Sequence, residues 1–191
     1  DPPGYLTYVS NANGGITRFL LDKTYRTVGL IDPLNRTNSF VLDPMGRLLY
    51  TTNALGKIAG ITAYDSLGRP ITNKAVATSP ASVCYAYDNA GNVSATRIVA
   101  GLTNLATSFA HDAAGQLVSL TDPAGYSTRL AYDNAGNMVR QVIPTGATNT
   151  YEYDSLNRPS SVSDPLGASW SNVYDLAGNL VTSMVNGAIT V

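Results

Sequence analysis

The sequence predicts an all-β protein of about nine antiparallel β-hairpins, each about 21 residues long, stacked side by side with essentially no helix. Three observations predict this fold. A short phrase centred on Asp recurs at a nearly constant spacing, and a second turn signal lies about ten residues after each copy. In addition, no stretch shows the apolar period of 3.6 residues that an amphipathic helix needs.

The recurring phrase is Tyr-Asp-x-x-Gly, and its Asp residues define what we call the main column. Clear copies are YDSLG (64–68), YDNAG (87–91), YDNAG (132–136) and YDLAG (174–178), and weaker copies are LDKTY (21–25), LDPMG (42–46), HDAAG (111–115) and YDSLN (153–157). The main column comprises Asp1, Asp22, Asp43, Asp65, Asp88, Asp112, Asp133, Asp154 and Asp175. The spacing is loosest over 66–111, where segments 71–83 and 98–104 indicate small insertions.

The second column of turn signals divides each period into two runs of five to seven residues. Its members are NANG (11–14), DPLN (32–35), NALG (53–56), DPAG (122–125), IPTG (143–146) and DPLG (164–167). In Asp-Pro-x-Gly the Asp side chain can bond forward to the backbone, Pro presets φ, and Gly suits the left-handed residue that follows a type I turn. Such a turn is a common hairpin connection, so each period is predicted to be one hairpin.

The runs between the turns are predicted strands with two unlike faces. Relative to each main-column Asp, positions −1 and −3 share a face and are mostly large, as in Tyr153 and Tyr151. Position −2 lies on the other face and is usually smaller, as in Ala131. Position +5 is expected to pack against the aromatic column. Tyr is therefore interpreted as the packing contact between repeats, and Asp-x-x-Gly as the corner.

An isolated hairpin is marginal in water, so we expect residues 1–191 to form a single stacked β-sheet segment. A long twisted sheet spirals into the wall of a shell or tube. The chain begins inside a repeat, at Asp1-Pro2-Pro3-Gly4, so we expect a fragment of a longer chain. A chain of this length is expected to bury about 70% of its unfolded surface, and a hydrophobic content of 44% can support a core.

The composition argues against several classes of protein. The net charge is −1 and only 13% of residues are charged, so no basic face for nucleic acid is expected. No apolar run approaches the roughly 18 residues of a membrane-spanning helix, and DPPGYLTYV at the start lacks the features of a signal peptide. The single Cys84 allows no internal disulfide. A chain poor in Cys and rich in Asn, Ser, Thr and Gly fits a secreted protein.

The phrase and its period closely resemble the YD-repeat, or Rhs-repeat, family. The copies that carry the resemblance best are YDSLGRP (64–70), YDNAGNV (87–93), YDNAGNM (132–138), YDSLNRP (153–159) and YDLAGNL (174–180). The family includes bacterial Rhs proteins, the C components of insecticidal toxin complexes and teneurins. The resemblance implies a sheet that spirals into a hollow shell, which encloses a toxin in the bacterial members and belongs to an adhesion receptor in teneurins. The autoprotease segment that ends many bacterial shells has no counterpart here.

The predicted functional residues are the structural repeat motif itself. They are Tyr64, Asp65, Gly68, Tyr87, Asp88, Gly91, His111, Asp112, Gly115, Tyr132, Asp133, Gly136, Tyr153, Asp154, Tyr174, Asp175 and Gly178. No catalytic residue, cofactor site or metal site is predicted. Of the thirteen acidic residues, only Glu152 lies outside the two turn columns, so an acid/base carboxylate pair has little support. A calcium row along the Asp corners is the weaker alternative, because one Asp per repeat gives few oxygens.

The remaining chemical groups have simple structural interpretations beside their functional ones. Cys84 and His111 could form a nucleophile–base pair, but each is more simply a packing residue. Arg26, Arg47, Arg69 and Arg158 all stand four residues after a main-column Asp. They could bind anions, but hydrogen bonding around the turn is favoured. Trp170 could stack on a sugar or pack on the sheet. No nucleotide-binding or hydrolase motif is present.

Three functions follow as competing hypotheses, and an enzyme is not expected. The first is a structural shell or wall segment of a bacterial secreted or cell-surface protein, enclosing or displaying a cargo such as a toxin polypeptide. The second is self-assembly into a fibre or tube by edge-to-edge joining, because unpaired strand edges recruit other chains. The third is an adhesive or carbohydrate-binding surface. The expected partners are neighbouring repeats, of this chain or of other copies, and an enclosed polypeptide.

Overall fold

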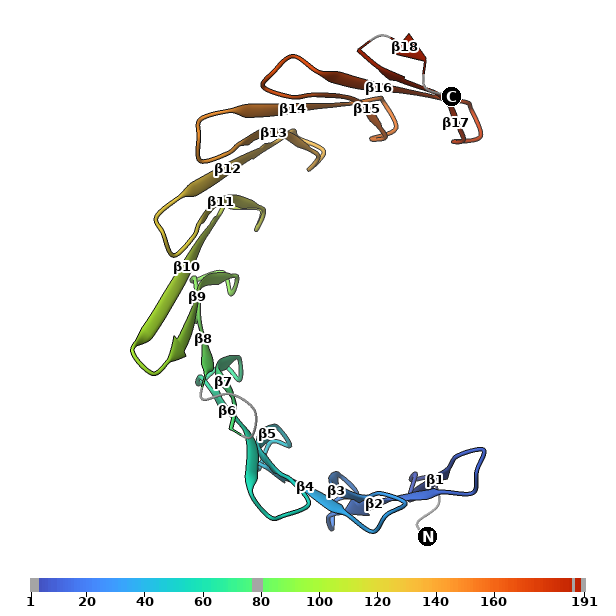
Figure 1. The fold of residues 1–191 in the computed structure, drawn as a ribbon, viewed down its shortest axis with the longest axis vertical. Coiled ribbons are helices and arrows are strands. Elements are labelled where there is room, and N and C mark those ends of the chain that lie inside the picture. Colours follow the sequence, from blue (N-terminus) through green and yellow to red (C-terminus); the bar gives the residue numbers. More distant parts are fainter. Residues whose placement is uncertain (1–3, 77–80, 187, 190–191) are drawn as a thin grey trace. The chain divides into compact units, whose positions relative to one another are not determined.

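A computed structural model describes residues 4–76, 81–186 and 188–189, and within these ranges every regular element is a β-strand (Figure 1). The main-column Asp1 and part of the irregular segment 71–83 lie outside the described residues. Since the described ranges contain no helix, none in them is long and apolar enough to cross a membrane.

The chain divides into two compact units, and each is described by itself. Unit 1 comprises residues 1–86 and 96–105, and unit 2 comprises residues 87–95 and 106–191. Unit 1 holds β1 (Tyr8–Ser10), β2 (Ile16–Leu21), β3 (Thr27–Ile31), β4 (Thr37–Leu42), β5 (Leu48–Thr52), β6 (Ile58–Tyr64), β7 (Pro70–Ala75) and all but the last residue of β8 (Ser82–Tyr87). Residues of β9 (Val93–Ala100) and β10 (Thr103–His111) belong to both units.

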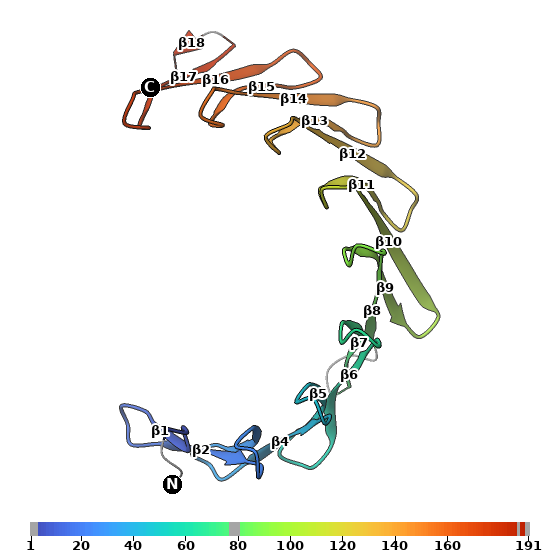
Figure 2. The ribbon, with the colours of Figure 1, turned by 180° about the vertical axis from the view of Figure 1, so that it is seen from behind.

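Unit 2 continues the series of short strands. It holds β11 (Leu117–Thr121), β12 (Ser127–Tyr132), β13 (Met138–Val142), β14 (Thr148–Tyr153), β15 (Pro159–Ser163), β16 (Ser169–Tyr174), β17 (Leu180–Val185) and β18 (Ala188–Ile189). In both units each strand pairs antiparallel with the next one along the chain, so neighbours in sequence lie side by side (Figures 1 and 2). The prediction of antiparallel hairpins without helix is confirmed.

A register shift accompanies each main-column hairpin whose pairing lies within one unit. In the β12–β13 hairpin Tyr132 lies opposite Met138, but the preceding Ala131 lies opposite Arg140, so Val139 is an extra residue. The same shift occurs one residue before each Asp in β2–β3, β4–β5, β6–β7, β10–β11, β14–β15 and β16–β17. Such a bulge increases the local twist and re-aims the flanking side chains. It keeps the +5 residue on the face that carries the Tyr.

The two faces of the sheet in unit 2 differ in chemistry. We call the face that carries positions −1 and −3 the Tyr face. One row of directly opposed residues on it runs from Tyr151 through Val162 to Trp170. The opposite face, here the Ser/Thr face, has Glu152 opposite Ser161 and Ser161 opposite Ser171. Short polar β-formers suit a wet sheet face, and aromatic side chains suit a half-buried one.

In each unit the sheet is a single layer, and no hydrophobic side chain in the described ranges is fully buried. The accessible surface is 12606 Å², whereas a compact monomer of 20.1 kDa exposes about 8,700 Å². Compared with about 29,000 Å² for the unfolded chain, folding buries about 57% of the surface. The burial expected from chain length is therefore too high, and the part of the chain that the structure describes forms no fully buried hydrophobic core. The reason is that a lone sheet covers neither of its faces.

Candidate functional site

The structural feature that recurs most regularly is the corner, by which we mean positions −1 to +5 around each main-column Asp. At Asp133 the carboxylate oxygen Oδ1 accepts the backbone N–H groups of Ala135 and Asn137, each at 2.9 Å. The backbone N–H of Asp133 donates to the carbonyl of Asn137 at 2.9 Å, and that of Gly136 donates back to the Asp133 carbonyl at 3.1 Å. The side chain thus satisfies turn donors that the ladder leaves unpaired.

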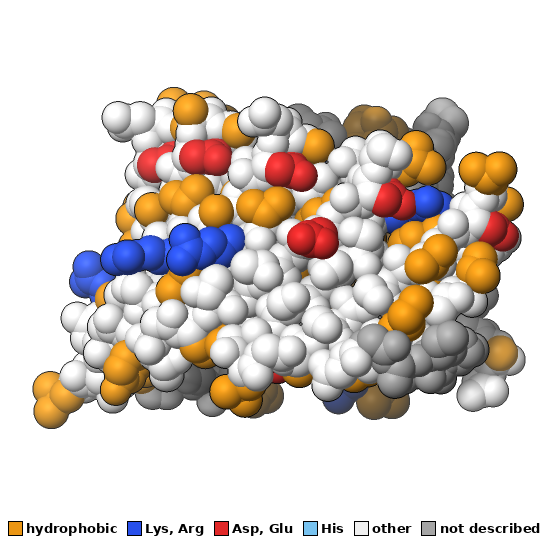
Figure 3. All heavy atoms as spheres, turned by 90° about the horizontal axis from the view of Figure 1, so that it is seen from above, with side chains coloured by type: hydrophobic (Ala, Val, Ile, Leu, Met, Phe, Trp, Pro, Cys, Tyr) orange, Lys and Arg blue, Asp and Glu red, His pale blue; other side chains and the backbone are white. Residues whose placement is uncertain are grey.

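The same Asp geometry recurs along both columns of turns. Oδ1 accepts the N–H groups of positions +2 and +4 at Asp22, Asp43, Asp65, Asp88, Asp112, Asp154, Asp32, Asp122 and Asp164, and the amide oxygens of Asn11 and Asn53 do the same. At Asp175 Oδ1 accepts the N–H of Asn179 at 2.8 Å. Figure 3 shows acidic side chains that recur at intervals on one face, among apolar, uncharged and basic groups.

Position +3 of each corner has a left-handed backbone. Gly136 has φ 88° and Gly68 has φ 82°, a conformation that costs most other residues about 1–2 kcal/mol. Gly91, Gly115 and Gly178 share it, with φ of 94°, 81° and 90°. Two corners keep this φ without Gly, because Asn157 has φ 60° and Tyr25 has φ 62°.

The second carboxylate oxygen, Oδ2, binds the side chain at position +4 in most corners. The Nε of Arg47 lies 2.6 Å from Asp43, and the Nδ2 of Asn137 lies 2.9 Å from Asp133. Arg26, Arg69 and Arg158 repeat the first arrangement at 2.7 Å, and Asn92 and Asn179 repeat the second at 3.1 and 2.9 Å. The hydrogen-bonding interpretation of the Arg residues is therefore confirmed in place of an open anion-binding ladder.

These bonds hold the corner carboxylates in the ionised form. The side-chain amide of Asn137, followed by its backbone N–H, lowers the pKa of Asp133. At Asp43 burial, the largest single influence, raises the pKa, but the backbone and guanidinium of Arg47 outweigh it and the net pKa is lowered. The pKa values of Asp22, Asp32, Asp65, Asp88, Asp154 and Asp175 are lowered too. Asp43, with 8% of its surface exposed, is the one buried polar residue among those described.

The Tyr at position −1 links one repeat to the preceding one. The hydroxyl of Tyr132 donates to the backbone carbonyl of Leu117, the +5 residue of the previous corner, at 2.8 Å. The hydroxyls of Tyr64, Tyr153 and Tyr174 donate in the same way to the carbonyls of Leu48, Met138 and Pro159, at 3.0, 3.1 and 2.9 Å. Each of these +5 residues also lies opposite the −1 residue of its own corner. It therefore contacts two repeats.

Two of these Tyr rings also receive a cation from the previous corner. The guanidinium carbon of Arg47 lies 4.7 Å from the centre of the Tyr64 ring, and that of Arg158 lies 4.5 Å from the centre of the Tyr174 ring. Contacts of this kind are worth about 0.5–1 kcal/mol when exposed. Asp, Arg and Tyr therefore form one chain of contacts that runs from corner to corner. The sequence showed the residue types but gave no sign of this connection across repeats.

One of the predicted motif residues, His111, replaces the Tyr of the phrase, whereas Tyr87 keeps it at the end of β8, where it is half-buried. His111 takes the Tyr position in β10, where it is 14% exposed and its Nδ1 lies 3.7 Å from Oδ2 of Asp88. That nitrogen is buried without a hydrogen-bond partner. His111 therefore lacks the hydroxyl group with which Tyr132 binds the previous repeat.

The described residues provide little for catalysis or metal binding. Within them, no three His, Cys, Asp or Glu side chains gather closely enough to hold a metal ion. The Sγ of Cys84, in unit 1, accepts a hydrogen bond from Oγ1 of Thr72 at 3.9 Å, whereas His111 belongs to unit 2. In seven corners the turn already occupies both carboxylate oxygens, those of Asp22, Asp43, Asp65, Asp88, Asp133, Asp154 and Asp175.

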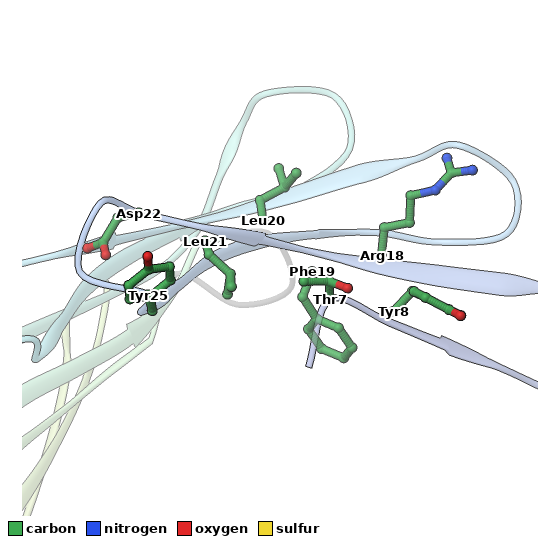
Figure 4. A pocket seen from close by; sticks show the side chains of 8 residues that line it. All are labelled: Thr7, Tyr8, Arg18, Phe19, Leu20, Leu21, Asp22 and Tyr25. Carbon is green, nitrogen blue, oxygen red and sulfur yellow. The ribbon is translucent and has the colours of Figure 1, made fainter. Parts of the chain in front are cut away.

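A hollow of about 600 Å³ lies beside β2 in unit 1 (Figure 4). Its lining comprises Thr7, Tyr8, Arg18, Phe19, Leu20, Leu21, Asp22 and Tyr25. Phe19 and Leu21 extend to one side of β2, and Leu20 and Arg18 extend to the other. The only carboxylate of this lining, that of Asp22, is bound by Thr24 and Arg26. The hollow therefore combines aromatic and apolar side chains with Arg18 and with a carboxylate that the turn already binds.

Comparison with known proteins agrees with the repeat pattern of the sequence. Residues 111–148, which hold the corners of Asp112 and Asp133, match the family model RHS Repeat. The resemblance to the Rhs-repeat family is thereby confirmed, with this stretch as the matched part. No curated protein matches the chain by sequence.

The fold is similar to that of three solved toxin-complex structures. The crystal structure of TcdB2-TccC3-Cdc42 has a TM-score of 0.60 and 14% identity, that of TcdB2-TccC3 has 0.58 and 14%, and that of TcdB2-TccC3-TEV has 0.57 and 15%. In each case the alignment covers 94% of this chain and 12% of the other. The chain thus spans about an eighth of the length of these proteins, and at this identity the likeness concerns the fold.

Proposed function

We propose that this chain is a non-catalytic wall segment of a YD-repeat shell in a secreted or surface bacterial protein, where it encloses or displays a cargo such as a toxin polypeptide. One observation carries the proposal. The distinctive side chains of the corners bind their own turn or the neighbouring repeat rather than converge on a reactive centre. A chain whose recurring side chains hold its own repeats together is suited to forming a wall.

The exposed area supports the same role. A single layer that leaves 12606 Å² accessible has two open faces, as the wall of a container must. The faces differ, since one carries the aromatic row and the other carries Ser and Thr. A wall between two different environments accounts for this difference. The fold likeness to structures that contain TccC3 adds to the support.

The partners proposed on this basis are other YD repeats and an enclosed polypeptide. Neighbouring repeats would contact the chain through its corners and strand edges. The enclosed polypeptide would meet only one face. This asymmetry makes the proposal testable, because the two faces of the sheet can be addressed separately.

The experiment labels two adjacent residues of β16 that point to opposite faces. Cys84 is replaced by Ser, and Trp170→Cys or Ser171→Cys is then introduced into the native full-length parent protein and into the isolated chain. A bulky polymer-linked maleimide reagent should label both positions in the isolated chain. In the parent it should label only one, because a closed wall shields its inner face. Equal labelling of both positions in the parent would refute the wall.

A glycan-binding surface is the second candidate, favoured by one specific arrangement on the Tyr face. Trp170 is 41% exposed, and on the same face Oε1 of Gln141 accepts hydrogen bonds from Asn149 and Tyr151 at 3.1 and 3.3 Å. An exposed indole on a face that also carries planar amides suits a sugar ring. Binding on a glycan array that Trp170→Ala abolishes would support it, and a blank array would remove it. Self-assembly stays a prediction, which sedimentation over a range of concentrations would test.

A further inference from the structure

The side chain at position +4 reaches beyond its own corner to the turn of the next repeat. Nη1 of Arg158 lies 3.1 Å from the carbonyl oxygen of Asp175, and Nε2 of Gln116 lies 3.4 Å from that of Gly136. Nη1 of Arg26 approaches the carbonyl of Asp43 at 3.5 Å. The +4 side chain therefore lies against the turn whose fourth residue is the left-handed +3 position.

In two of the turns a side chain at +3 would crowd the end of the previous +4 side chain. A Cβ atom added to Gly68 would lie 2.9 Å from Nη1 of Arg47, and one added to Gly136 would lie 3.2 Å from Nε2 of Gln116. Arg47 binds Asp43 at 2.6 Å and covers the Tyr64 ring at 4.7 Å, so a side chain at Gly68 would displace the end of an Arg that makes both contacts. The absence of a side chain at Gly68 thus serves the neighbouring repeat as well as the turn itself.

The two corners without Gly at +3 have a different residue at the preceding +4. Asn157 follows a corner whose +4 residue is Asn137, and Nδ2 of Asn137 donates to Oδ1 of Asn157 at 2.9 Å. Tyr25 stacks on Tyr5, which stands four residues after Asp1, with ring centres 4.4 Å apart and planes 19° apart. Where +3 carries a side chain, the previous +4 residue is one that can bind it.

We infer that positions +4 and +3 of successive corners form a matched pair that determines which repeat can lie beside which. A long Arg or Gln whose end lies against the +3 position of the next turn, as those of Arg47 and Gln116 do, favours Gly there, whereas Arg158 leaves that space open. An Asn at +4 is compatible with an Asn at +3, and an aromatic residue at +4 is compatible with an aromatic residue at +3. The pair is a specificity determinant between hairpins, additional to the requirement of the turn for positive φ. This inference rests on the corner contacts alone and does not depend on the proposed function.

A double-mutant cycle tests the pair at Arg47 and Gly68. Asn is the residue other than Gly that best tolerates a left-handed backbone, so Gly68→Asn isolates the steric conflict. We expect Gly68→Asn to lower Tm strongly beside Arg47 and less beside Arg47→Asn, which recreates the Asn137–Asn157 arrangement. The double variant should melt about 2–4 °C above the value expected from adding the two single shifts.

Arg158 and Gly178 provide the matched control. Gly178 has φ 90°, and a Cβ added there would have no atom within 4 Å. Gly178→Asn therefore carries the cost of positive φ without the clash, so its cycle with Arg158→Asn should show a smaller coupling, limited to the hydrogen bond that the new Asn pair can form. Additive shifts at Arg47 and Gly68, or an equal coupling at both pairs, would overturn the inference.

If Gly68→Asn fails to fold, a second double-mutant cycle, which starts from the Asn137–Asn157 pair, tests the inference. Asn137→Arg should destabilise the protein while Asn157 is present and should be tolerated together with Asn157→Gly. Folding of Arg47→Asn/Gly68→Asn but not of Gly68→Asn alone would support the matched pair. Equal loss of Tm from Asn137→Arg in both backgrounds would overturn it.

Discussion

A single hydroxyl group connects Tyr132 to the preceding repeat. It donates to the Leu117 carbonyl at 2.8 Å from a half-buried position. We predict that Tyr132→Phe costs about 1 kcal/mol, because it leaves that carbonyl without this donor. In thermal unfolding this corresponds to a fall in Tm of about 2–4 °C.

The control for this substitution is Tyr126→Phe. Tyr126 is 62% exposed in a second-column turn, and the turn uses its backbone N–H rather than its ring. Its variant should melt with the wild type. An equal fall in Tm for the two variants would show that the hydroxyl-to-carbonyl bond contributes nothing specific.

Within unit 2, His111 occupies position −1 of its corner, where the clear copies of the phrase have Tyr. Its buried Nδ1 has no hydrogen bond, and the +5 residue of the preceding corner is Val93. We predict that His111→Tyr raises Tm by about 2–4 °C, because the longer side chain can donate to the Val93 carbonyl as Tyr132 does to Leu117. A lowered Tm would mean that the position is shaped for the imidazole.

At the scale of the hairpin, the corners whose Asp has a lowered pKa couple the fold to pH. The pKa of Asp133, and those of seven other turn Asp residues, are lower in the folded chain than the ordinary value of 3.8. Between the folded and unfolded pKa values the unfolded chain binds more protons. The stability that these groups contribute is therefore complete above about pH 4 and is lost as the pH falls through the folded pKa values.

We accordingly predict a nearly constant Tm from about pH 7 to about pH 5 and a steep fall below about pH 4. Asp133→Asn should lower Tm at neutral pH and reduce the steepness of the acid limb, since one of the coupled carboxylates is gone. Glu152→Gln, which changes an exposed carboxylate outside the corners, should leave the limb unchanged. A wild-type Tm that stays flat down to about pH 2 would contradict the coupling.

The sequence predicted the parts of this element that local chemistry determines. Asp-x-x-Gly and Asp-Pro-x-Gly specify their turns within a few residues, so the hairpins and their period followed from the sequence alone. Three features did not follow from the sequence alone. They are the bulge at each corner, the hydroxyl contact of Tyr132, and the contact of Asn137 with Asn157. The two contacts join residues 15 and 20 positions apart, and which atoms meet depends on the register of strands that the phrase alone does not specify.

At the scale of the molecule, composition was a poor guide to burial. A hydrophobic content of 44% is compatible with a core, yet the apolar groups are spread over two faces of single-layer sheets. Leu176 at a main-column turn and Leu166 at a second-column turn are almost fully exposed. The stability of the chain must therefore come mainly from strand pairing and from corner contacts between adjacent repeats.

This mode of stabilisation predicts a small heat-capacity change on unfolding. A compact protein of 191 residues would show about 2.3–2.9 kcal/mol/K, and the value scales with the surface exposed on unfolding. Because folding buries about 57% of the surface instead of about 70%, we expect a value about one fifth lower from differential scanning calorimetry. The measurement should be made at several protein concentrations. A value as large as that of a compact protein, increasing with concentration, would show that copies of the chain cover the open faces of one another.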